Sequence, residues 1–398
     1  MNARQYLIVC GTALFSVMGV SSVLPVLPLL AKAFHIADAR IGILIAGFTL
    51  PGIFLTPLGG VLSDRVGRKR VLIPSLVLFS LGGLGCFFSG SQTEIFLWRI
   101  VQGIGAASLG TLYNTLIGDL CPDETQRLKA LGSTMMLVAV GGALFPALGG
   151  LMGEWRLMSP FLLALCALPL ALLVCATELP RPAVSGQNLS SYMRQGISRI
   201  SERGNLSLFA ISFIIFGILY GPIITYFPLL AYSRHAASPP QIGFIYAATI
   251  IGISFGGLFL PRLSRRFSAR ALGLCAAVFF CAAMLLMPCS TSLWICAVPV
   301  LCYGLGQGML YPAAMSALSG GVPEHTRSIV LAANATTIRL SQTLMPSLCG
   351  LFFTWWGFEG VFGGGLLLAG LLFLFVPAAL AARNLGREAE SFETARPE

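Results

Sequence analysis

Charged residues are scarce in this sequence. Asp, Glu, Lys and Arg together make up 10% of the 398 residues, whereas hydrophobic residues make up 56%. A soluble domain carries about a quarter charged residues. The ordinary soluble classes are therefore excluded, and we expect most of the chain to lie in lipid.

The sequence also lacks the patterns of an enzyme or a nucleotide-driven pump. It has no G-x-x-x-x-G-K-[ST] loop, so any transport must draw its energy from gradients. No loop gathers serine, histidine and acidic residues around a nucleophile. Eleven cysteines fall mostly inside apolar stretches, without a C-x-x-C pair or a neighbouring histidine. We therefore expect no catalytic residues, no disulfide framework, no metal site and no cofactor.

Long apolar stretches are what the sequence does contain. Each has about 20 residues or more, enough for a helix to cross about 30 Å of hydrocarbon. They predict an all-α membrane protein with twelve transmembrane helices, at residues 6-33, 40-62, 71-92, 95-118, 130-152, 157-177, 206-232, 240-260, 271-289, 291-318, 328-354 and 358-381.

The net charge of +10 sets the orientation of these helices. In a soluble chain such a charge would suggest nucleic acid, but here the basic residues follow the loops. With the N-terminus inside, nineteen of the 25 Lys and Arg residues fall in inner segments and four in outer ones. This asymmetry predicts a bacterial inner (plasma) membrane protein with both termini cytoplasmic, with lipids and no nucleic acid as partners. The first helix is too long for a cleaved signal peptide and is expected to stay attached.

The longest polar stretch, at residues 179-205, divides the chain into bundles of six helices at 1-178 and 206-398. Helical spacing of apolar and basic residues within this stretch suggests either an amphipathic helix on the inner leaflet or an ordinary solvated linker. Ordered matches at an offset of about 200 residues indicate a duplicated unit, as in carriers whose two repeats rock about a central site. They pair residues 28-31 with 228-231, 102-103 with 307-308, and Pro146 and Gly150 with Pro346 and Gly350.

The loop at residues 59-70 reads GGVLSDRVGRKR. It closely resembles the signature loop of the major facilitator superfamily, G-x-L-x-D-R-x-G-R-K. The resemblance implies that Asp64 faces the positive N-terminal end of helix 11, near Arg327 and Ser328, and latches the cytoplasmic gate shut. In the second half Pro261 replaces this acid, so only the first half is expected to carry a full latch. The expected gating residues are Gly60, Asp64, Arg65, Gly67 and Arg68.

Three further segments resemble the twelve-helix drug-proton antiporter branch of this superfamily. The resemblance implies efflux by antiport, with alternating access through rocking halves. In helix 5, Phe145 stands where the branch has a glycine, and the motif is also open to interpretation as generic packing by small residues. The residues that carry the resemblance are Gly19, Pro25 and Pro28 in helix 1, Arg99, Gln102 and Gly103 in helix 4, and Gly141, Pro146, Gly149 and Gly150 in helix 5.

Two arginines, Arg99 and Arg339, lie within predicted helices, where each would cost about 2.5 to 3.5 kcal/mol on insertion scales. Arg99 lies near the outer end of helix 4 and also suits a structural role bonded to backbone. Arg339 lies near the middle of helix 11, in a polar run that includes Gln342. None of the fifteen acidic residues and three histidines falls in the middle of a helix, which leaves proton coupling open and favours an anionic or neutral substrate.

We therefore predict a secondary transporter that exports a small amphipathic, drug-like or organic anionic compound. Two alternatives remain: an uptake or exchange carrier for an organic anion, and a membrane receptor or lipid-handling protein with the same fold. With no sign of a partner chain, we expect a monomer. The predicted substrate-binding residues are Arg99, Arg339, Gln307, Tyr220, Tyr226, Tyr311 and Gln342.

Overall fold

The computed structural model describes the chain except for residues 122, 181–199, 323 and 395–398. The described residues form helices and no strands. The elements are α1 (Ala3–Ser21), η1 (Leu24–Val26), α2 (Leu27–Ala33), η2 (Asp38–Arg40), α3 (Gly42–Val66), α4 (Arg68–Phe88), α5 (Gln92–Ala107), α6 (Leu109–Leu120), α7 (Glu124–Trp155), η3 (Ser159–Cys166), α8 (Ala167–Ala176), α10 (Arg203–Ile218), η4 (Leu219–Tyr226), α11 (Phe227–His235), α12 (Pro239–Leu263), α13 (Ala269–Leu286), η5 (Trp294–Cys296), α14 (Ala297–Gly320) and α15 (Glu324–Thr394). The predicted linker helix falls almost wholly outside the described residues.

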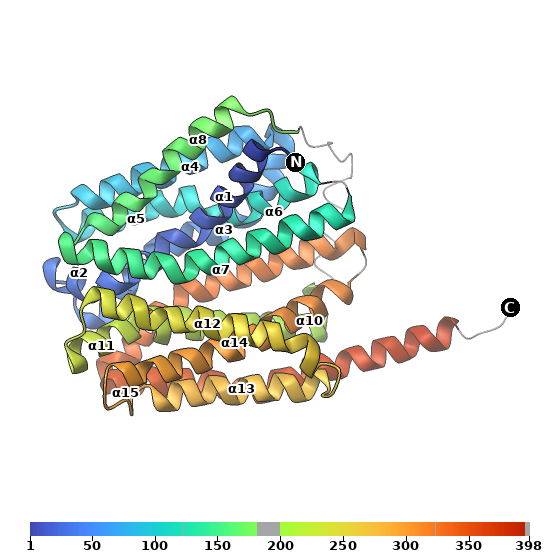
Figure 1. The fold of residues 1–398 in the computed structure, drawn as a ribbon. Coiled ribbons are helices and arrows are strands. Elements are labelled where there is room, and N and C mark those ends of the chain that lie inside the picture. Colours follow the sequence, from blue (N-terminus) through green and yellow to red (C-terminus); the bar gives the residue numbers. More distant parts are fainter. Residues whose placement is uncertain (122, 181–199, 323, 395–398) are drawn as a thin grey trace.

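Eleven segments of the described chain are long and apolar enough to span a membrane, and the last of them covers 51 residues. Within this segment Gly357 has φ 59° and ψ −145°, a backbone conformation that only glycine adopts readily. The chain therefore turns there and crosses the membrane twice, which confirms the predicted twelve helices. The final helix runs on to Thr394, beyond the predicted end at 381, and projects from the bundle (Figure 1).

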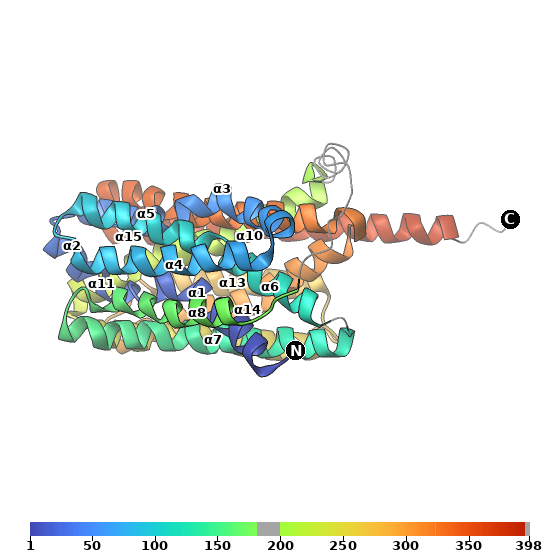
Figure 2. The ribbon, with the colours of Figure 1, turned by 90° about the horizontal axis from the view of Figure 1, so that it is seen from above.

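The helices of the first half, α1 to α8, lie on one side of the molecule, and those of the second half, α10 to α15, lie on the other (Figure 1). The two halves meet mainly where α7 packs against α12 and where α3 packs against α15. Both chain ends lie at one end of the bundle, which we call the termini end, and α2 and α11 lie at the opposite, far end (Figures 1 and 2).

Glycines let the halves meet without side chains between them at the far end. A Cβ added to Gly243 of α12 would come within 2.3 Å of the carbonyl oxygen of Pro146, and one on Gly42 of α3 within 2.6 Å of that of Pro346. Real Cβ atoms essentially never show such distances. The two contacts are related by the offset of about 200 residues. The same glycine–proline contact, made once by each repeat, therefore closes the far end.

Polar contacts add to this closure. Lys32 at the end of α2 donates a 3.0 Å hydrogen bond to the hydroxyl of Tyr232 in α11, with its ammonium 4.5 Å from the ring centre. Tyr226 is fully buried, and its hydroxyl donates to the carbonyl of Ala39 at 3.4 Å. The far end is thus closed by packing and by hydrogen bonds.

The same faces are uncovered toward the termini end. The face of α7 that carries Pro146 continues through Met135, Gly132 and Leu128. Met135 and Leu128 are each 63% exposed. Nothing lies within 4 Å of a Cβ built on Gly132. Leu258, on the termini half of α12, is 62% exposed. The described residues thus form a bundle that is closed at the far end and diverges toward the termini end.

Candidate functional site

Arg339 lies at a contact between the two halves. It is on the second half, in α15, and its side chain crosses to Gly52 of α3, where an added Cβ would come within 3.0 Å of its Cδ and 3.1 Å of its Nε. On the far side of Arg339, Thr343 donates a 2.9 Å hydrogen bond to Thr49 of α3. Arg339 thus bridges α3 and α15 on the termini side of the contact between Thr343 and Thr49.

The guanidinium group of Arg339 is poorly satisfied by the protein. Its one hydrogen bond in the described structure is from Nη1 to the side-chain oxygen of Gln342, at 3.2 Å. No carboxylate pairs with it among the described residues, and its side chain is partly accessible. Since a guanidinium has five N–H donors, most of its hydrogen-bonding capacity is available to a ligand or to water.

Tyr220 lies close to this group. Its hydroxyl is near enough to both Arg339 and Arg99 for their charges to act on it. Tyr220 belongs to η4, a π-helical segment that contains Pro222, and its carbonyl accepts a 2.6 Å hydrogen bond from Thr225. Local π-helix often marks functional sites, because it turns side chains away from the regular helical face.

Arg99, in contrast, is held by the first half. It is 1% exposed; its Nε donates to the carbonyl of Leu44 at 3.1 Å, and its Nη1 donates to the carbonyl of Gly19 at 2.7 Å and to Gln102 at 2.8 Å. Its charge also lies 4.4 Å from the ring centre of Phe48. One nitrogen, Nη2, has no partner in the described structure. These contacts support the structural role considered above and make direct substrate binding by Arg99 the weaker interpretation.

The other predicted ligand residues divide between two regions. Tyr311 of α14 is partly buried, with its ring edge-on to Phe216 at 5.2 Å. Gln307 of the same helix is buried, and its side-chain oxygen has no hydrogen-bond donor among the described residues. Tyr226 lies instead in the far-end closure, so the structure does not bring it to Arg339.

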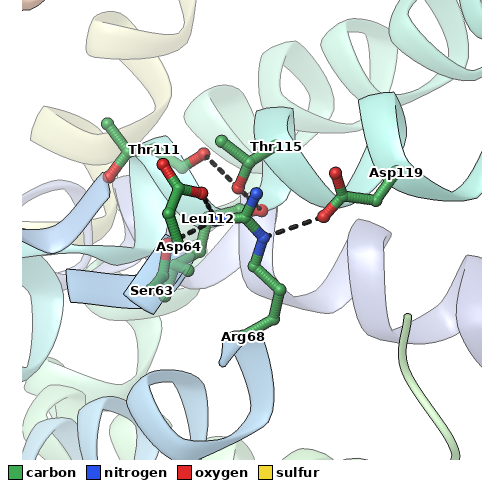
Figure 3. Close-up of polar contacts among 7 residues, drawn as sticks. All are labelled: Ser63, Asp64, Arg68, Thr111, Leu112, Thr115 and Asp119. Atoms are coloured by element: carbon green, nitrogen blue, oxygen red, sulfur yellow. Dashed lines mark hydrogen bonds and ion pairs between the residues drawn. The ribbon is translucent and has the colours of Figure 1, made fainter. Parts of the chain in front are cut away.

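The predicted gating loop forms an ion-pair cluster at the termini end (Figure 3). Buried Arg68 bonds Asp64 of α3 through Nη1, and Asp119 of α6 through Nε at 2.8 Å. Arg68 also donates to the hydroxyl of Ser63 at 2.6 Å. Gly67, with φ 105°, makes the turn between α3 and α4 that permits this geometry.

Among the described side chains, none of α15 pairs with Asp64, so the expected latch is not seen there. The Asp64 side chain is 55% exposed and pairs with Arg68 of its own half, while Arg327 is exposed at the start of α15. The side chain of Ser328 lies outside the described part. An unlatched Asp64 agrees with the divergence of the halves at this end, because the latch belongs to the closed gate. Gly60 and Arg65, the other predicted gating residues, lie in the last turns of α3.

The predicted packing residues occupy tight contacts. A Cβ on Gly149 would come within 1.8 Å of the carbonyl oxygen of Ser22, and one on Gly103 within 2.2 Å of that of Phe48. Gly19, Gly141 and Gly150 are similarly close to neighbouring helices, and Pro25, Pro28, Gln102 and Pro146 are buried. Within α7, Gly141 to Gly150 thus contact both α1 and α12.

The chain matches the family model described as Major Facilitator Superfamily over residues 9–237 and again over 209–397. It belongs to the major facilitator superfamily. The first match covers the first half and continues to residue 237, and the second match covers the second half. Membership makes the protein a multi-pass membrane transporter, as predicted.

Sequence relatives of this superfamily member are named as exporters or resistance proteins. It is 24% identical to Multidrug resistance protein 2 of Bacillus subtilis, over 87% of this chain and 88% of that protein. It is 23% identical to Quinolone resistance protein NorA of Staphylococcus aureus, over 84% and 86% of the two chains. A match to the Bacillibactin exporter of Bacillus subtilis is 30% identical but spans only 40% of this chain and 41% of the exporter. The predicted resemblance to the drug-proton antiporter branch is confirmed.

Similar solved structures bear on the fold of this chain alone, because their sequence identities to it are low. The nucleoside transporter NupG superposes with a TM-score of 0.75 at 14% identity, over 96% of this chain and 99% of that one. The D-xylose-proton symporter superposes with a TM-score of 0.71 at 18% identity, over 94% and 98%. These neighbours confirm the predicted major facilitator fold.

Sequence reasoning missed the N-terminal side of the site. Gly52 and Thr49 bring α3 against Arg339 and Thr343, and neither is among the predicted site residues. Gly52 follows Pro51 in an otherwise apolar helix, and the position of Thr343 one turn after Arg339 places both on the same face. The pairing of α3 with α15 could be found only once the fold was known.

Proposed function

We propose that this transporter exports a small amphipathic organic anion, and that Arg339 binds the anionic group. The single observation that carries the proposal is the position of Arg339. A guanidinium that makes one hydrogen bond within the described structure stands at a contact between the two halves. A carrier must hold its substrate where both gates can reach it, which is at such a point.

The charge of the site favours an anion over the cation that a drug exporter might be expected to take. Arg339 and Arg99 supply two positive charges near Tyr220, and no described acidic side chain bonds either of them. A bound carboxylate, sulfonate or phosphate would accept two parallel hydrogen bonds from the free edge of a guanidinium. A cationic substrate would find only repulsion.

The cycle that we propose uses both groups of gating contacts. In this conformation the far end is closed by the glycine contacts and by Lys32 and Tyr232, and the Asp64 latch is released. With the termini end in the cytoplasm, as the distribution of Lys and Arg predicts, the substrate enters from the cytoplasm. Rocking of residues 1-178 against 206-398 then closes the latch and opens the far end. Export as the direction is supported by the sequence relatives, which are named as an exporter and as resistance proteins.

Transport in proteoliposomes tests the proposal. Three radiolabelled probes share a naphthalene ring and differ in the group at position 2: a sulfonate, an uncharged methyl sulfone and a trimethylammonium. We expect the protein to move the sulfonate and not the trimethylammonium compound. Arg339→Ala should abolish sulfonate transport, and Arg339→Lys should reduce it at least tenfold, because a lysine cannot donate two parallel hydrogen bonds.

The matched control is Arg270→Ala, which removes an exposed arginine from the second half, at the start of α13. It should transport the sulfonate at the wild-type rate. Transport of the trimethylammonium probe with Arg339→Ala unaffected would overturn the proposal, and so would the failure of all three probes to move.

A further inference from the structure

We infer that the membrane potential drives export of the anion directly, without a proton carried by the protein. The inference rests on the proposed function and adds its source of energy. Two observations support it: the described groups at the site keep their charge at physiological pH, and the membrane potential favours the exit of an anion.

The complete sequence places every acidic residue near a helix end or outside the helices of the membrane core. Asp64 and Asp119 lie in the last turns of α3 and α6, where both pair with Arg68. Glu94 and Glu124 lie in the first turns of α5 and α7. The acids remaining within the apolar segments also lie near their outer or inner limits, for example Glu154 in the last turn of α7.

The described neighbours of Arg339 do not change charge with pH. Gly52 of α3 lies against it with Thr49 beyond, its own helix contributes Gln342 and Thr343, and Tyr220 of η4 is near enough for its charge to act. Tyr220 itself lies within electrostatic reach of Arg99 on the first half. On the second half it lies within reach of Tyr246 and Tyr303. Between pH 5 and pH 8 arginines stay protonated and tyrosines stay neutral, since histidine is the side chain that ordinarily titrates there.

An anion needs no such group in order to be expelled. Moving one elementary charge through a membrane potential is worth about 2.3 kcal/mol per 100 mV. Bacterial cells are negative inside, so this energy favours the exit of a monovalent anion and opposes the exit of a cation. At −100 mV it supports an outside-to-inside ratio of roughly 50 for a singly charged anion.

The charge movement follows from the site. Arg339 compensates the anion while it is bound, so that an electrically neutral pair occupies the membrane interior. The arginine stays with α15 when the anion is released, so each turnover moves one negative charge outward and no proton. Proton antiport would instead require a group at the site that binds a proton in one conformation and releases it in the other.

The experiment uses the complete protein in vesicles loaded with 2-naphthalenesulfonate, whose charge does not depend on pH. A potential of −100 mV inside is imposed with potassium and valinomycin at equal pH, and, separately, a gradient of two pH units is imposed at zero potential. We expect the potential to expel the sulfonate toward a ratio of roughly 50. The pH gradient alone should produce no concentration ratio above that of protein-free vesicles.

The outcomes separate the inference from the proposed function. Accumulation driven by the pH gradient at zero potential, or acidification measured by an internal pH dye during sulfonate exit, overturns the inference and leaves anion export standing. Absence of sulfonate movement under every condition overturns the proposed function as well. Asp119→Asn and Asp64→Asn serve as controls: we expect neither to change the steady-state ratio, although both change the rate. A changed ratio in either variant would assign proton coupling to that carboxylate and contradict the inference.

Discussion

Arg339 of α15 and Gly52 of α3 contact each other across the two halves. The arginine can reach this point because Gly52 has no side chain. An added Cβ would lie 3.0 Å from Cδ and 3.1 Å from Nε, which is closer than nine in ten real contacts. The position of the charge thus depends on a residue of the opposite half.

The first prediction concerns this contact. Gly52→Val should displace the guanidinium and weaken anion binding, raising the KM for 2-naphthalenesulfonate about tenfold with less effect on the maximal rate. Gly110→Val is the control, because nothing lies within 4 Å of a Cβ at Gly110. An unchanged KM in Gly52→Val would mean that Arg339 does not bind the anion from this position.

The second prediction separates the two arginines by their effect on stability. Arg99→Ala removes three buried hydrogen bonds, to the carbonyls of Leu44 and Gly19 and to the side chain of Gln102. A hydrogen bond to a charged group is worth about 1.5 to 3 kcal/mol, so the melting temperature should fall by several degrees. Arg339→Ala leaves only Gln342 without its partner and should change the melting temperature little. Thermal unfolding of the purified variants in detergent measures both, and equal losses would contradict the assignment.

The third prediction concerns the far end. Gly350 packs against Ala39, whose carbonyl oxygen would lie 2.0 Å from an added Cβ, so Gly350→Leu should prevent closure there. Cysteines introduced at positions 32 and 232, in a protein whose native cysteines are replaced, report the distance between the halves. We expect them to crosslink readily with glycine at position 350 and several-fold less with leucine. The control is Gly363→Leu, at a glycine whose Cβ would meet nothing within 4 Å.

The fourth prediction concerns the ion pairs of Arg68. The side chain of Asp119 is 25% exposed and that of Asp64 is 55% exposed, so solvent screens the Arg68–Asp64 pair more strongly than the Arg68–Asp119 pair. Asp119→Asn should therefore cost more stability, at most about 1 kcal/mol after this screening, and Asp64→Asn less. Double-mutant cycles with Arg68→Met measure each coupling. A larger coupling to Asp64 would show that the cluster is tighter on the α3 side in solution.

Much of this architecture could be predicted from the sequence. Hydrophobic runs specify helices in lipid, because every backbone group must be hydrogen-bonded within its own segment. The positions of Pro146 and Pro346 predicted a symmetric role that the contacts with Gly243 and Gly42 now explain. The two halves follow from repeated motifs that need no alignment.

The sequence could not separate the roles of Arg99 and Arg339, which look alike as isolated charges in apolar helices. The difference lies in their neighbours: Arg99 meets backbone carbonyls of two other helices of its own half, whereas Arg339 meets a glycine of the opposite half. Likewise Tyr226 and Tyr220 lie six residues apart in η4, but Tyr226 bonds Ala39 at the far end, whereas Tyr220 lies within reach of the charge of Arg339. Pairings between distant segments decide these roles, and periodicity carries no information about them.

The central claim, that Arg339 binds the anion, is tested most directly by calorimetric titration of the purified protein with 2-naphthalenesulfonate. Wild type and Arg270→Ala should bind with the same Kd. Arg339→Ala should bind at least tenfold more weakly, since a hydrogen bond to a charged group is worth about 1.5 to 3 kcal/mol. Equal affinity of Arg339→Ala and the wild type would contradict the account.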